Sequence, residues 1–239
     1  MGVIRRYRTA WSRHHRSAGF GIHSPHAFRF VREILRERNP YYAYQQIAFW
    51  RKNVIQAMRK SKHHPQVMSL QNAKMIFRIT NHFTPAHILQ IGSNYGLAAA
   101  SMMAANSQAH IHLYEPQTDR FEVTTQVLKP HAYAITAHDS LATAIAQYRQ
   151  ALSDSDLPFV LVNDLPHDDD FDTLREFLFS LLAKNAVIIM RNISRNARLK
   201  ILWQECQQQA TYGQTFTNEK IGIIVANPKL QREDFLLWF

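Results

Sequence analysis

Short apolar runs alternate with longer segments of helical periodicity from residue 69 onward, and this alternation constrains the fold more than any other feature of the sequence. The runs are continuously apolar rather than alternating, which is typical of strands buried on both faces of a sheet. The expected strands are 86–91, 111–114, 133–135, 159–162 and 186–190, with a closing hairpin at 214–217 and 221–225. The expected helices are 70–82, 97–105, 119–128, 140–152, 171–183 and 195–209.

Strands that alternate with helices require right-handed crossovers, so the sequence predicts an α/β fold with a doubly wound, mainly parallel, seven-stranded sheet. We expect residues 66–239 to form this domain. Residues 1–65 are expected to form a basic, aromatic-rich helical extension. Its first helix should begin with Ser24 as N-cap and Pro25 in the first turn, and it should end at Asn39-Pro40. A second helix should lie within 42–59, followed by a break at 63–66.

Several classes of protein are disfavoured by composition. No run of 18 apolar residues exists, so no membrane-spanning helix is expected, and the basic N-terminus is not followed by the apolar core of a signal peptide. Cys206 is the only cysteine, which rules out an internal disulfide and fits a reducing cytoplasm. We therefore expect a cytoplasmic protein without a membrane span.

The net charge of +10 is concentrated at one end of the chain. Residues 1–60 hold 13 Lys and Arg against 2 Asp and Glu, whereas the remainder holds 15 against 16. This asymmetry suggests a nucleic acid or an anionic membrane surface as partner. The favoured alternative is a solvated basic face, or an arm packed on an acidic patch of the body. Aromatic residues among these cations could stack on bases or simply cover the core.

Polar residues at the carboxyl ends of the predicted strands mark the expected ligand site, because open α/β sheets bind ligands there. Gly92 and Gly96 lie in the turn after the first strand, where glycine allows tight turning and close ligand approach. Glu115 follows the second strand, 19 residues beyond Gly96, a spacing suited to binding ribose hydroxyls. Asp139 and Ser140 follow the third strand and could contact an adenine or cap the next helix.

The motif Ile88-Leu-Gln-Ile-Gly-Ser-Asn-Tyr-Gly96 resembles the first motif of class I S-adenosylmethionine (SAM)-dependent methyltransferases, especially small-molecule O-methyltransferases. The stretches 21–28 and 74–79 resemble a methyltransferase-like group common in Bacteroidetes. The resemblance implies a Rossmann-like methyltransferase fold and SAM as cofactor. The cofactor-binding residues it implies are Gln90, Gly92, Ser93, Asn94, Gly96, Glu115, Asp139, Ser140 and Asn163.

Two departures from the family pattern affect the expected chemistry. Gln90 stands where the family has an acid, so it cannot supply a charge to the cofactor. Metal-dependent members carry acidic residues after the fifth strand, where this chain has Arg191 and Asn192, and we therefore expect no bound metal. Arg191 and Asn192 are the predicted acceptor-contacting residues. Asp164 and His167 are the predicted catalytic bases, although His167 could equally be an exposed loop histidine.

Three hypotheses of function follow. The first is metal-independent O- or N-methylation of a small-molecule acceptor, with the N-terminal helices as a lid over the acceptor. The second is RNA methylation through the basic N-terminal segment. The third is a degenerate, non-catalytic binding module, motivated by Gln90 and Arg191. A homodimer is left open by the sequence.

Overall fold

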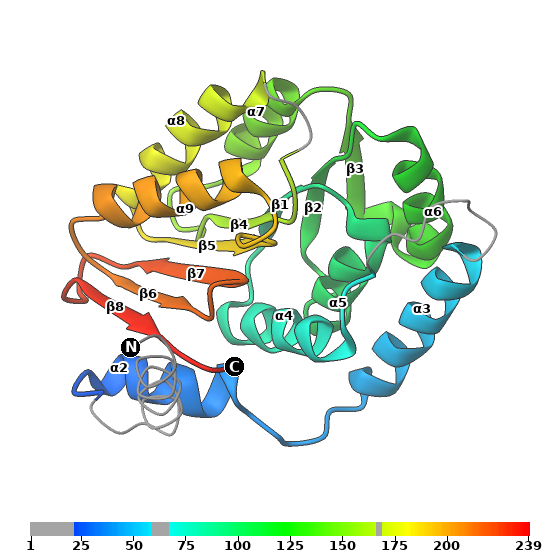
Figure 1. Cartoon of the computed structure of the whole chain (residues 1–239). Helices are drawn as coiled ribbons and strands as arrows, with labels where there is room; N and C mark the ends of the chain where they lie inside the picture. Colours follow the sequence, from blue (N-terminus) through cyan, green and yellow to red (C-terminus); the bar gives the residue numbers. More distant parts are fainter. Residues whose placement is uncertain (1–21, 59–66, 166–168) are drawn as a thin grey trace, which may run out of the picture.

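An eight-stranded sheet with helices on both faces forms the centre of the protein (Figure 1). The structure, a computed structural model, describes residues 22–58, 67–165 and 169–239. Along the sheet the strands follow the order β3-β2-β1-β4-β5-β7-β6-β8. Their bounds are β1 His87–Ile91, β2 His110–Tyr114, β3 Ile135–His138, β4 Phe159–Val162, β5 Ala186–Arg191, β6 Gln214–Thr217, β7 Ile221–Ala226 and β8 Glu233–Leu236.

Strands β1 to β5 are parallel, and β7 pairs antiparallel with both β5 and β6. This confirms the predicted doubly wound, mainly parallel α/β fold with a closing hairpin. The predicted count of seven strands was one too low, because β8 adds parallel to β6. Its sequence, Glu-Asp-Phe-Leu, contains no apolar run. The strand forms because Phe235 stacks on Phe216 with ring centroids 5.2 Å apart, and Thr215 hydrogen-bonds Asp234.

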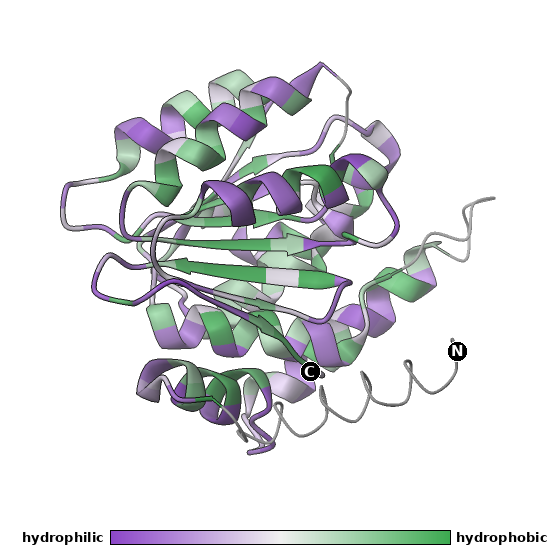
Figure 2. Cartoon of the chain, turned by 60° about the vertical axis from the view of Figure 1, so that its left-hand side comes forward, coloured by the Kyte–Doolittle hydropathy of each residue, from purple (hydrophilic) through white to green (hydrophobic). Residues whose placement is uncertain are grey.

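Helices cover the sheet in two layers. The main helices are α2 Pro25–Arg29, α3 Ala43–Met58, α4 Leu70–Phe83, α5 Leu97–Ala105, α6 Thr118–Leu128, α7 Leu141–Ala151, α8 Asp170–Leu182 and α9 Ala197–Gln209. Helices α7, α8 and α9 pack on one face, where they share an apolar cluster with Leu89 and Ile91. Helices α4 and α5 pack on the other face against Ile88 and Leu161. Figure 2 shows the apolar strands enclosed between helices whose outer surfaces are polar.

The N-terminal helix starts as predicted but ends earlier. Ser24 Oγ accepts a hydrogen bond from the Ala27 N–H, and Pro25 occupies the first helical position. A π-helical turn, η1 Phe30–Leu35, continues α2 and ends it four residues before Asn39, where the Asn-Pro pair was expected to do so. Buried Arg78 of α4 accounts for this end, because its guanidinium donates to the carbonyl oxygens of Ile34 and Leu35 at 2.5 and 2.9 Å.

The first N-terminal helix also contacts β6, the second-last strand of the sheet. Gln214 of β6 donates to Ser24 Oγ at 2.7 Å, and its Oε1 lies 2.7 Å from His26 Nδ1. Phe30 packs on Phe216 with ring centroids 4.8 Å apart. The division of the chain at residue 65 stays a prediction, and the expected break at 63–66 lies outside the described residues. None of the described helices is both long and apolar enough to span a membrane.

Candidate functional site

The turn between β1 and α5 is held in left-handed backbone conformations. The φ angles of Gly92, Asn94, Tyr95 and Gly96 are 76°, 47°, 62° and 78°. A Cβ atom at Gly92 would lie 3.1 Å from the backbone nitrogen of Asp164, so a side chain there is disfavoured by both space and conformation. Tyr95 is a bulky residue with positive φ, and such strain is concentrated at binding and catalytic sites. The turn therefore has the character of a ligand loop.

Glu115, at the end of β2, holds this turn in place. Its Oε2 accepts hydrogen bonds from the Ser93 backbone N–H at 2.8 Å and from Ser93 Oγ at 2.7 Å, while Oε1 accepts from the Gln117 N–H at 3.1 Å. The glutamate is buried. The structure thus brings two of the predicted cofactor residues, Ser93 and Glu115, into direct contact across neighbouring strands.

Gln90 of β1 stabilises the same turn through side-chain hydrogen bonds. Its Nε2 donates to the carbonyl oxygens of Gly92 and Ser93, both at 3.1 Å, and the side chain is fully buried. A carboxylate could not donate these two bonds, which gives a physical reason for an amide at a position that is acidic in the family. Gln90 Oε1 and Asn94 Oδ1 are buried and find no hydrogen-bond partner within the described residues.

The ends of β4 and β5 are linked to the turn by a chain of amides and one cation. Asn163 Nδ2 donates to the Gly92 carbonyl oxygen at 2.7 Å, and Asn163 Oδ1 accepts from Arg191 Nη1 at 2.7 Å. Asn192, with a φ of 59°, donates to the Asn163 carbonyl oxygen at 2.8 Å. Arg191 is 4% exposed, and burial together with the nearby Arg195 charge lowers its pKa to about 10. The cation is therefore held where its charge is poorly solvated.

Asp164 lies beside this chain and is already engaged. Its Oδ2 forms an ion pair with Arg120 Nη1 of α6 at 3.0 Å, and its Oδ1 accepts from the Leu165 N–H at 3.0 Å. Arg120 also lies over the Tyr95 ring, 6.0 Å from its centroid. The role of Asp164 as a base stays a prediction, and the other predicted base, His167, lies outside the described residues.

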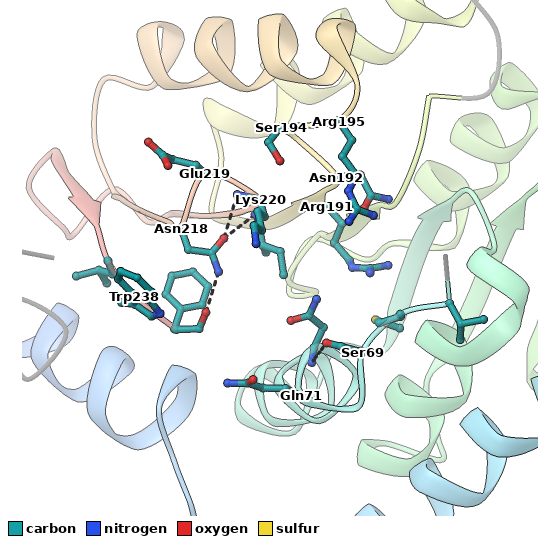
Figure 3. Close-up of a pocket in the computed structure, with 16 residues that line it drawn as sticks. Ser69, Gln71, Arg191, Asn192, Ser194, Arg195, Asn218, Glu219, Lys220 and Trp238 are labelled. Carbon is teal, nitrogen blue, oxygen red and sulfur yellow. Dashed lines mark hydrogen bonds between the residues drawn. The ribbon is translucent and has the colours of Figure 1, made fainter. Parts of the chain in front are cut away.

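A cavity of about 530 Å³ opens next to Arg191 (Figure 3). Its walls come from the start of α4, the end of β5, the β6–β7 turn and the segment after β8. No described residue of 22–58 is among those that line it, so the lid expected from the N-terminal helices stays a prediction. Of the predicted site residues, Arg191 and Asn192 line this cavity.

The fold can be compared with known proteins at this point. No protein-family model and no curated protein sequence matches the chain. Solved structures do match. The O-methyltransferase TomG from Streptomyces achromogenes, in complex with SAM, is 13% identical over 78% of this chain and 90% of that chain, with a TM-score of 0.55. An O-methyltransferase from Bacillus cereus in complex with SAH is 12% identical over 82% and 96%, with a TM-score of 0.54. A methyltransferase from Geobacter sulfurreducens is 14% identical over 84% and 97%, with a TM-score of 0.53.

The chain has the class I methyltransferase fold. The predicted Rossmann-like methyltransferase architecture is therefore confirmed, whereas membership of a Bacteroidetes-type group stays a prediction. In this methyltransferase fold the Gly92–Gly96 turn, Glu115, Asn163 and Arg191 lie at one edge of the sheet, where β1, β2, β4 and β5 end.

Of the two predicted residues that follow the third strand of this methyltransferase fold, Ser140 has a structural role. Ser140 caps α7, since its Oγ accepts from the Thr143 N–H at 3.1 Å, as the capping interpretation predicted. Asp139 is exposed beside it. A contact of either residue with an adenine stays a prediction.

The described oxygen atoms at this edge are already engaged by other partners. Asp164 is paired with Arg120, Asn163 Oδ1 accepts from Arg191, and no group of three His, Cys, Asp or Glu side chains suited to a metal occurs in the described ranges. A hard cation requires several oxygen ligands, and the buried guanidinium would repel it. The donor set does not fit Mg²⁺.

Three cationic residues that lie near the carboxyl ends of the parallel strands were not predicted from the sequence. Arg120, Arg195 and Lys220 reach this edge of the sheet from three segments that are remote in the chain. For Arg120 a weak signal existed, because it lies in the first turn of the helix after Glu115. No local pattern marks Arg195 or Lys220. Five of the 13 N-terminal cations lie in residues 1–21, outside the part described, so the nucleic-acid prediction stays untested.

Proposed function

We propose that this protein is a SAM-dependent methyltransferase that methylates an oxygen or nitrogen atom of a small molecule without a metal. One observation carries the proposal: the strained Gly92–Gly96 turn is bonded through Ser93 to Glu115. This arrangement lies at the edge where open α/β sheets bind ligands. The comparisons support it, since the TomG and Bacillus cereus structures of the same fold hold SAM and SAH.

The unpaired atoms of the turn suit the polar groups of this cofactor. Gln90 Oε1 and Asn94 Oδ1 are buried acceptors without a partner among the described residues, and an ammonium group is a donor that would satisfy them. The Glu115 carboxylate can accept from ribose hydroxyls. Gly92 leaves the backbone open to close approach. When bound, SAM supplies a methyl group on an electrophilic sulfonium.

The remaining chemistry falls to the chain's own residues. Methyl transfer needs an aligned acceptor and, for a hydroxyl or protonated amine, removal of one proton. Arg191 and Asn192 are proposed to orient the acceptor, while Asp164 and His167 are the proposed proton acceptors. The engagement of Asp164 by Arg120 and of Asn163 Oδ1 by Arg191, the described oxygen atoms that follow β4, supports metal independence. Cys206, the only cysteine of the sequence, supports a cytoplasmic location, because a lone thiol suits a reducing compartment.

Calorimetric titration of the full chain with SAM and SAH, each with Mg²⁺ and with EDTA, tests the proposal. We expect micromolar binding that does not depend on the metal. Glu115→Gln should weaken binding at least tenfold, because the amide cannot accept at both positions. Glu122→Gln, an exposed change on α6, is the matched control and should bind normally. If wild-type protein binds neither compound, the degenerate-module hypothesis replaces this one.

A further inference from the structure

The cavity beside Arg191 has a marked excess of positive charge. The cations Arg191, Arg195 and Lys220 line it (Figure 3). Glu219 is the one acidic side chain in the lining, and its carboxylate points away from the cavity in the same view. A small anion entering this space would therefore be attracted by the cations of the lining.

Arg191 is the strongest evidence for an anion site, because its charge is buried and no carboxylate among the described residues pairs with it. The side chain is 4% exposed, its Nη1 bonds the neutral amide of Asn163, and its Nε has no partner among the described residues. Burial and the charge of another cation, Arg195, lower its pKa. A buried guanidinium normally has an anionic partner, since an unpaired buried charge is strongly unfavourable. Here the space where such a partner could sit is the cavity.

The start of α4 faces the same cavity. Ser69, Gln71 and Asn72 line it, and the first turn of this 14-residue helix contains no acidic side chain that would neutralise its positive end. Free N–H groups and the helix dipole at this end favour anions. The helix start alone would not define a site, but it faces the unpaired guanidinium across the cavity.

Apolar and aromatic side chains also line the cavity. They come from Met68, just before α4, and from Leu237, Trp238 and Phe239 after β8, where a main-chain oxygen of Phe239 accepts from Asn218 Nδ2 at 2.8 Å. A volume of about 530 Å³ exceeds what a single phosphate or carboxylate group fills. The lining thus combines cationic side chains with apolar and aromatic ones.

The geometry points to an acceptor subsite that takes the anionic group, a carboxylate or a phosphate, of a small molecule with an apolar body. This inference rests on the proposed function, which gives the cavity its acceptor. Two hydrogen bonds connect the subsite to the proposed cofactor turn, from Arg191 to Asn163 and from Asn163 to the Gly92 carbonyl. Arg191 is accordingly a specificity-determining residue that binds the anion.

Isosteric probes separate charge recognition from shape. We would titrate the full chain calorimetrically, with SAH present, with benzoate, with neutral benzamide and with phenyl phosphate. Benzoate or phenyl phosphate should bind at least tenfold more tightly than benzamide, and the tighter of the two identifies the anion. Arg191→Gln and Arg195→Gln should each weaken that anion at least fivefold. In Arg195→Gln, which has no bond to the cofactor turn, SAH binding should stay within twofold. Arg175→Gln, the same charge change on α8 away from the cavity, should have no effect.

The outcomes distinguish this inference from the proposed function. Equal binding of anions and benzamide, or anion binding that neither cavity variant weakens, would overturn the subsite even if SAH binds. Anion binding that depends on Arg195 in a protein that binds no SAH would support the subsite and overturn the methyltransferase proposal. Arg195 is exposed, so its variant should fold even if Arg191→Gln does not.

Discussion

Arg120 and Asp164 form an ion pair of 3.0 Å across the carboxyl end of β1. Arg120 belongs to α6, which follows β2, and Asp164 follows β4, while β1 lies between these two strands in the sheet. The pair therefore spans the turn at Gly92 that is proposed to receive the cofactor. Both side chains are about a third exposed, at 27% and 31%. Ion pairs of this exposure contribute at most about 1 kcal/mol, so this one can separate when a ligand binds.

Replacing Arg120 with Gln should therefore raise SAM affinity rather than lower it. If the pair must open for the cofactor to enter, its removal takes away a cost of up to about 1 kcal/mol, which corresponds to roughly a two- to fivefold tighter Kd. Calorimetric titration of Arg120→Gln measures this, with Arg175→Gln as control. A weakened affinity would mean that the guanidinium itself contacts the cofactor.

Replacing Gln90 with Glu should destabilise the protein. Glu at this fully buried position cannot donate to the carbonyl oxygens of Gly92 and Ser93, and it places an acceptor against both. We expect a loss of about 2–4 kcal/mol in the free energy of unfolding, measured in urea at pH 7. Gln150→Glu, an exposed change on α7, should stay within about 0.5 kcal/mol. Wild-type stability of Gln90→Glu with tighter SAM binding would refute the supporting role of Gln90.

Gly92→Ala should impair both folding and cofactor binding. Its φ of 76° and the 3.1 Å approach of a Cβ to the Asp164 nitrogen predict a destabilisation of about 1–3 kcal/mol. Gly213→Ala provides the comparison, because its Cβ would lie 2.4 Å from the Val225 carbonyl oxygen, away from the turn. Both variants should lower Tm, but only Gly92→Ala should weaken SAM binding by the folded protein. Equal SAM affinities in the two variants would argue against the turn as the cofactor loop.

Acid should destabilise the protein through a histidine cluster on β1, β2 and β3. Burial, followed by the charges of His110, His138 and His87, lowers the pKa of His112 from 6.5 to about 4. The ring of His112 stacks on that of His138 at 5.5 Å. In the unfolded chain His112 becomes protonated below pH 6.5, whereas in the folded chain it becomes protonated only near pH 4. The free energy of unfolding therefore falls as the pH decreases from 6.5 to 4.

The fall should reach roughly 3 kcal/mol from His112 by pH 4, measured as the free energy of unfolding between pH 7 and pH 4. His112→Leu removes the titrating group and should flatten the profile. His23→Leu, at an exposed position, should keep the wild-type profile. An unchanged slope in His112→Leu would show that other groups cause the acid sensitivity.

The sequence by itself determined the order of elements and most of the sheet. Continuous apolar runs such as 159–162 are solvent-excluded on both faces, so burial alone selects them as strands, and β4 has those bounds. The run expected at 133–135 lies instead at Ile135–His138, because residues 129–134 form a 3₁₀ turn. Gly92, Ser93 and Glu115 could be predicted as neighbours, since parallel strands place their ends together.

Tertiary structure decided what those residues contact. Glu-Asp-Phe-Leu forms β8 only because it pairs with β6 and because Phe235 stacks on the Phe216 ring. Arg191 could be singled out in the sequence, but not its burial or its missing partner. The cavity joins the start of α4, the end of β5 and the β6–β7 turn, which are remote along the chain. Local propensity acts over a few residues, whereas the charge of a cavity depends on which distant side chains the packed fold brings together.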